Sequence, residues 1–294
     1  MKSLFQGSDH DLEYCRVIFF AWLLLLFWSN SWDAYGQLSP SLYRGLGPPP
    51  DSAWLPALNR LWLLSLACAS LGFLTRLSTW LAFALGVYLL GLDWSFGNTH
   101  HTHHLILLCL AALAWARCGQ RFSLDERLTR SRPSWRRVLL GESSSEGWCV
   151  RLCQLLWCLL FFNAGLAKLR HSGLAFVDGE NFQHILLFTQ HWYEGQPSPL
   201  RGLVLHHAGL ASLLAACGLA LELSAPLAFF VRTGVWRWGL VLGLALLQVG
   251  ASQLMHLDEF RKMAACYVFW IPWSRLALAV ASLKASRSSS PEAG

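Results

Sequence analysis

The sequence predicts an all-α, polytopic membrane protein with about eight transmembrane helices. Of its 294 residues, 54% are apolar and only 14% are charged, whereas a soluble domain usually carries about 25% charged residues. Several apolar runs approach or exceed the roughly 18–20 residues that a helix needs to cross a bilayer. The 16 tryptophans fit the same class, because tryptophan concentrates at membrane interfaces.

We expect one transmembrane domain over residues 10–284, followed by a disordered cytoplasmic tail at residues 285–294, where several serines follow the last apolar run. Eight apolar segments are predicted to span the bilayer, with edges near 13–31, 54–74, 77–94, 103–117, 148–168, 203–231, 235–256 and 262–281.

The loop after the fourth predicted span sets the orientation, because positive residues remain on the cytoplasmic side. It contains seven arginines: Arg117, Arg121, Arg127, Arg130, Arg132, Arg136 and Arg137. Counting spans outward from this loop places both chain ends inside, in a multi-pass protein of the plasma or inner membrane. The net charge of +6 then reflects orientation signals in short loops, and we predict no nucleic-acid partner.

Lys168 ends an apolar helical run and is predicted to lie at the outer end of the fifth span. A charge at the edge of hydrocarbon loses its hydration, so such a lysine is a candidate for a functional role. Burial favours the uncharged form of an amine, which would let the side chain act as a base near neutral pH. The alternative is that it only extends to the outer headgroups.

A group of four histidines opens the fourth predicted span, on the same outer side as Lys168. His103 and His104 are our candidates to assist the lysine, and the alternative is that they are interfacial side chains. A membrane metalloenzyme is a further alternative. However, only His100 and His104 have the HxxxH spacing of histidine-box enzymes, and the group is predicted to face outward. We therefore predict no metal.

Polar residues within the later spans are also candidates. Glu222 lies in an apolar run just before Pro226, and a carboxylate there must be paired or protonated. For Glu222 and Pro226, a purely structural role and a role in a functional site remain equally open. Gln248, Ser252 and Gln253 share one face of the seventh predicted span, where they either bind a cofactor or form interhelical hydrogen bonds.

Three stretches together resemble the HTTM (horizontally transferred transmembrane domain) superfamily, which includes the membrane part of vitamin K-dependent gamma-glutamyl carboxylase. The stretches are Phe162-x-Ala164-Gly165-x-x-Lys168-Leu169 with Asp178-Gly179, then Arg121-Phe122-Ser123-Leu124-Asp125, and Leu221-Glu222-Leu223-Ser224-Ala225-Pro226 with Ser252-Gln253-Leu254. Their order and spacing extend the resemblance over roughly residues 10–280.

The resemblance implies that Lys168 is the base that deprotonates a reduced quinone of the vitamin K or menaquinol type, with His103 or His104 supporting the site. The deprotonated quinol would react with oxygen and leave as its epoxide. The strong base formed would remove a glutamate γ-proton, and the carbanion would take up carbon dioxide. The chain departs from the family near Gln248, where no histidine stands.

The expected function is therefore that of a carboxylase-like membrane protein that uses a reduced quinone and oxygen. We assign Glu222, Gln248, Ser252 and Gln253 to quinone binding, and the expected partners are membrane lipid and the quinone. The alternative is a non-catalytic or accessory membrane protein that helps a secreted peptide to mature or leave the cell. A purely structural or transport role is a further alternative.

Overall fold

The structure is a computed structural model that describes residues 9–32, 54–95, 101–130, 147–192, 198–231, 234–255 and 259–288. Every regular element in these ranges is a helix, which confirms the all-α class. The chain divides into two compact units, one of residues 1–153 with 265–294 and one of residues 154–264. The sequence suggested a single domain over residues 10–284.

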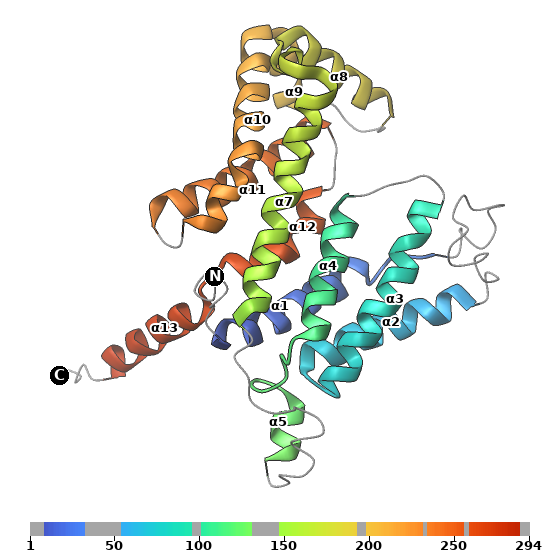
Figure 1. The fold of residues 1–294 in the computed structure, drawn as a ribbon, viewed down its shortest axis with the longest axis vertical. Helices are drawn as coiled ribbons and strands as arrows, with labels where there is room; N and C mark the ends of the chain where they lie inside the picture. Colours follow the sequence, from blue (N-terminus) through green and yellow to red (C-terminus); the bar gives the residue numbers. More distant parts are fainter. Residues whose placement is uncertain are drawn as a thin grey trace, which may run out of the picture. The chain divides into compact units, whose positions relative to one another are not determined.

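The first unit contains most of the N-terminal helices and the end of the chain (Figure 1). Its elements are α1 (Asp9–Phe27), α2 (Trp54–Leu71), α3 (Thr75–Ser95), α4 (His101–Trp115), α5 (Leu124–Thr129), η4 (Val268–Trp270) and α13 (Trp273–Ser288). Because α13 ends at Ser288, residues 285–288 of the predicted tail are helical. The remaining tail residues, 289–294, lie outside the described part of the chain.

Successive helices of the first unit pack side by side, α1 on α2, α2 on α3 and α3 on α4. Trp62 is fully buried and donates its indole N–H to the carbonyl oxygen of Ala82 at 2.9 Å, which ties α2 to α3. The end of the chain returns to α1, where the backbone N–H of Ser274 donates to Asp11 Oδ1 at 2.7 Å. The last described elements of the chain, η4 and α13, therefore complete the packing around α1.

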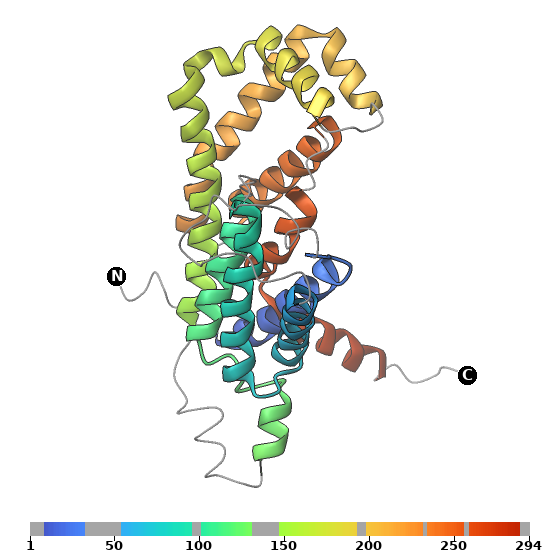
Figure 2. The same ribbon diagram turned by 90° about the vertical axis from the view of Figure 1, so that its right-hand side faces the viewer.

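The second unit contains the rest of α7 (Gly147–Ser172) and the elements that follow it (Figure 2). They are η3 (Gly173–Val177), α8 (Gly179–Trp192), α9 (Pro199–His206), α10 (Ala208–Phe230), α11 (Val235–Met255) and the first part of α12 (Glu259–Tyr267). A core that includes Phe182, Leu186 and Val204 joins α8 and α9 to α10 and α11.

Among the residues that the structure describes, four segments are long and apolar enough to cross a membrane, namely Thr75–Leu92, Gly147–Val177, Ala208–Phe230 and Val235–Met255. A fifth is counted if Phe260–Trp270 and Trp273–Ser282, which meet at a 70° bend, form one broken span. Large apolar side chains remain exposed on these helices, such as Leu213 and Leu246, as expected of surfaces that face lipid. The chain thus has the character of a membrane protein, whereas the span count of eight and its orientation remain predictions.

Candidate functional site

Lys168 on α7 and Glu222 on α10 form an ion pair within the second unit. The lysine Nζ lies 2.6 Å from Glu222 Oε2 and also contacts Oε1, so the ammonium donates to both carboxylate oxygens. The lysine side chain is 32% exposed and the glutamate side chain only 10%. The two residues were separate candidates in the sequence, and the structure brings them together.

A glycine allows the two helices to approach at this point. A Cβ atom placed on Gly165 would lie 3.0 Å from Glu222 Cβ and 3.2 Å from the side chain of Leu223. Gly165 and Lys168 are three residues apart and therefore lie on the same face of α7. The small residue thus brings the α10 backbone close enough for the lysine to reach the carboxylate.

The lysine lies deeper in its helix than the sequence suggested. The predicted span ended near residue 168, whereas α7 continues to Ser172 and the apolar segment to Val177. Helical side chains also lean toward the N-terminus of their helix, which directs this one away from the near end of α7. In the structure the ammonium thus pairs with Glu222, while its role as a base and its extension to the headgroups both remain predictions.

The turn after α7 is fixed against the start of α10. The hydroxyl of Ser212 donates to the carbonyl oxygen of Val177 at 2.6 Å, and Gly179 leaves no room for a Cβ atom beside the backbone of Ala208. This turn places the ring of Phe176 5.6 Å from Lys168 Nζ, in a cation–π contact. The ammonium group thus has a carboxylate and an aromatic ring as neighbours.

The α11 candidates lie apart from these contacts. Gln248 is buried and its amide contacts Met263 Sδ, while the hydroxyl of Ser252 donates to the carbonyl oxygen of Gln248 at 3.0 Å. The side chain of Gln253 is exposed, and its carbonyl oxygen accepts from Ser198 Oγ at 2.8 Å. The contact of Gln248 with Met263 joins α11 to α12, as the alternative of interhelical bonding expects, and the quinone-binding assignment remains a prediction.

The histidine candidates belong to the first unit. On α4, His103 is buried and its ring centroid lies 6.2 Å from that of Phe27. His104 is exposed and stacks on Trp94, with 4.2 Å between the ring centroids. Their grouping with Lys168 therefore stays a prediction. His100 lies outside the described residues. Within the described ranges, no three His, Cys, Asp or Glu side chains gather to hold a metal ion.

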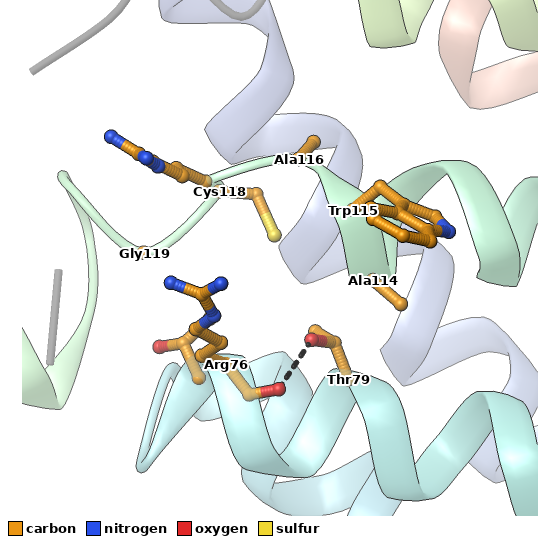
Figure 3. A pocket seen from close by; sticks show the side chains of 9 residues that line it. Arg76, Thr79, Ala114, Trp115, Ala116, Cys118 and Gly119 are labelled. Atoms are coloured by element: carbon orange, nitrogen blue, oxygen red, sulfur yellow. Dashed lines mark hydrogen bonds between the residues drawn. The ribbon is translucent and has the colours of Figure 1, made fainter. Parts of the chain in front are cut away.

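A separate pocket of about 220 Å³ opens in the first unit, between the first turns of α3 and the end of α4 (Figure 3). Its lining includes Thr75, Arg76, Thr79, Trp115 and Arg117. Figure 3 shows Arg76 rising from α3 toward the segment that carries Cys118 and Gly119. From the sequence alone, Arg117 is interpreted only as an orientation signal.

Sequence reasoning also missed a buried polar cluster beside that pocket. Asp125 accepts hydrogen bonds from the backbone N–H groups of Leu74 and Thr75, at 2.8 and 2.7 Å, and thereby caps the start of α3. Arg16 is fully buried and donates to carbonyl oxygens at the end of α2. A signal for Arg16 was present, because Glu13 stands three residues earlier at the start of an apolar run.

Arg201 is a second buried arginine that the sequence analysis did not single out. Its Nη2 donates to Leu186 O and to Thr189 Oγ1, both at 3.1 Å, and so ties α9 to α8. Burial lowers the pKa of this guanidinium from its ordinary value.

The comparisons with known proteins add no family to these observations. A scan against protein-family models, a search of curated proteins and a search of solved structures each returned no match. The case for a function therefore rests on the residues of the chain itself.

Proposed function

We propose that this protein is an integral membrane enzyme that deprotonates a reduced quinone at the Lys168–Glu222 pair and directs the quinol to react with oxygen, in the manner of the vitamin K-dependent carboxylase. The observation that carries the proposal is the ion pair itself, set between two helices long and apolar enough to span a membrane. A charged pair in such a place is costly to maintain and is typical of proton-transfer sites.

The chemistry needs a proton acceptor and a group that stabilises the anion. Lys168 Nζ lies within hydrogen-bond distance of both Glu222 oxygens, and the charged pair is the proposed starting state. When a quinol hydroxyl loses its proton, the Glu222 carboxylate can receive it and the ammonium can then stabilise the phenolate. Oxygen is the oxidant, and the quinol and oxygen together give the quinone epoxide and water.

Phe176 supports the choice of an aromatic substrate. Its ring lies 5.6 Å from Lys168 Nζ, so a flat quinol ring that approaches the ammonium meets an aromatic surface on which it can stack. About a third of the lysine side chain is exposed, so a ligand can approach this side chain from outside the protein. The protein would reside in the plasma or inner membrane.

The test is an epoxide assay in nanodiscs. Reduced menaquinone or vitamin K hydroquinone is supplied with oxygen, and the quinone epoxide is measured by mass-resolved chromatography for the wild type, Lys168→Ala and Glu222→Gln. We expect epoxide from the wild type and a loss of about 100-fold or more in each variant, the range typical of a missing acid–base group. Arg170→Ala is the matched control, since it removes a cation two residues away on the same helix.

The variant Lys168→Arg separates two forms of the mechanism. Arginine keeps the positive charge but does not lose its proton near neutral pH. If the ammonium stabilises the phenolate, Lys168→Arg keeps part of the epoxide yield, whereas a neutral lysine base predicts complete loss. Equal epoxide from the wild type and Lys168→Ala would refute the proposal, and so would a folded, quinol-loaded wild type that forms none.

A further inference from the structure

We infer that the pocket between α3 and α4 is a binding site for the phosphate group of an anionic lipid. This inference concerns the first unit alone and does not depend on the proposed quinol chemistry. Three observations support it: the positive charge of the pocket, the hydrogen bonds that the nearby Asp125 carboxylate already accepts, and the aromatic residues beside the pocket.

The charge of the pocket is positive. Two of its lining residues, Arg76 and Arg117, are arginines that come from different segments, and none of the described residues that line it is acidic. Arginine is suited to phosphate because its guanidinium offers several N–H donors in one plane. Arg76 is exposed and Arg117 half-buried, so a ligand can reach the pocket from outside the protein.

The Asp125 carboxylate beside the pocket already accepts hydrogen bonds. Asp125 is 1% exposed and accepts from Leu74 N, from Thr75 N and from Thr75 Oγ1, all at 2.7–2.8 Å. These hydrogen bonds hold the carboxylate at the N-terminus of α3. Asp125 is therefore committed to capping that helix, and the two arginines remain the charged groups that line the pocket.

The shape of the pocket depends on a close approach of the chain. A Cβ atom on Gly119 would lie 2.8 Å from Thr75 Oγ1, so only glycine lets the segment after α4 run this close to α3. That approach brings the segment that begins with Arg117 beside Arg76. The separation of the two arginines by 41 positions in the sequence conceals this arrangement.

Aromatic residues beside the pocket favour a lipid over a soluble phosphate compound. Trp115 lines the pocket and is 70% exposed. Its ring packs edge-on against Trp80 with 5.1 Å between the centroids, and α3 carries one of the apolar segments able to cross a membrane. Tryptophans at the end of such a helix are typical of the headgroup level of a bilayer. A phosphate held by the arginines would thus have its glycerol and acyl chains beside an apolar wall.

The experiment measures lipid binding to the full-length protein, purified in a maltoside detergent. Native mass spectrometry follows bound lipid during titration with dioleoyl phosphatidylglycerol. The comparison ligands are dioleoylglycerol, which has the same chains without phosphate, and inorganic phosphate. We expect phosphatidylglycerol to bind the wild type and dioleoylglycerol not to. We expect about tenfold weaker binding in Arg76→Gln and in Arg117→Gln, as for the loss of a hydrogen bond to a charged group.

Arg127→Gln is the matched control, because this exposed arginine lies in the same loop but does not line the pocket. Its affinity for phosphatidylglycerol is expected to equal that of the wild type. Since the Arg76 side chain is exposed, Arg76→Gln tests the site even if Arg117→Gln fails to fold. Unchanged affinity in Arg76→Gln would overturn the inference. Binding of inorganic phosphate as tight as that of phosphatidylglycerol would overturn the lipid assignment and indicate a soluble phosphate ligand. Equal binding of dioleoylglycerol and phosphatidylglycerol would overturn the role of the phosphate group.

Discussion

The Lys168–Glu222 pair should show strong energetic coupling in a double-mutant cycle. The perturbations are Lys168→Met, Glu222→Gln and the two combined. Each single change leaves one group without its partner between packed helices, whereas the double change removes both charges. The second substitution should therefore cost much less in the background of the first than it does in the wild type.

The geometry sets the size of this coupling. At the 2.6 Å that separates Lys168 Nζ from Glu222 Oε2, the gross Coulomb attraction is about 6 kcal/mol at an effective dielectric constant of 20. Most of it is offset by the lost hydration of the two groups. The glutamate is nearly buried but the lysine is 32% exposed, so we expect a net coupling of about 2 kcal/mol, between the values of surface and buried pairs.

The assay is thermal unfolding in detergent, followed by the fluorescence of the protein's 16 tryptophans. A coupling of about 2 kcal/mol corresponds to a shortfall of about 4–8 °C between the double variant's loss of Tm and the sum of the single losses. The control cycle pairs Lys168→Met with Glu180→Gln, an exposed acid of the same unit, and should be additive. Additive losses for Lys168 and Glu222 would refute the reasoning that the two groups stabilise each other.

Three further predictions follow from glycines and a cap. Gly165→Ala should lower Tm by a few degrees and reduce epoxide formation, because the added Cβ atom would lie 3.0 Å from Glu222 Cβ on α10. Gly209→Ala is the control and should change neither, because a Cβ atom there meets nothing within 4 Å. Asp125→Ala should cost about 1–2 kcal/mol of stability, because α3 loses its cap. The control is Glu126→Ala on the same helix, and equal Tm values for the two variants would contradict the capping role of Asp125. Gly179→Ala should lower Tm more than Gly165→Ala, since its Cβ atom would collide with backbone rather than side chains; the reverse order of Tm would argue against this.

The helices were predictable from composition, because apolar runs of this length leave few other structures open. The sequence also indicated Lys168 and Glu222, since a charge in such a run requires an explanation. It did not reveal that the two residues are partners. They are 54 positions apart, and their contact depends on how closely Gly165 lets two helices approach, which local periodicity does not encode.

The roles of the buried charges in the first unit were harder to predict. In the sequence, Arg76 and Arg117 look like the other arginines of short loops between apolar runs. Only the fold shows that they line one pocket. In the sequence, Asp125 only matched a family pattern. The structure gives it a physical role, because it accepts hydrogen bonds from the backbone at the start of α3. Such long-range capping depends on tertiary packing rather than on the residues next to it in sequence.

The return of the chain's end to α1 has a consequence for biosynthesis. Residues 265–294 belong to the same unit as residues 1–153, through contacts such as Ser274 with Asp11 and Phe269 with Phe19. Since α1 is synthesised before η4 and α13, its packing within this unit is complete only after those later elements have been made. We therefore expect a premature stop codon after residue 264 to destabilise α1 as well as to remove η4 and α13.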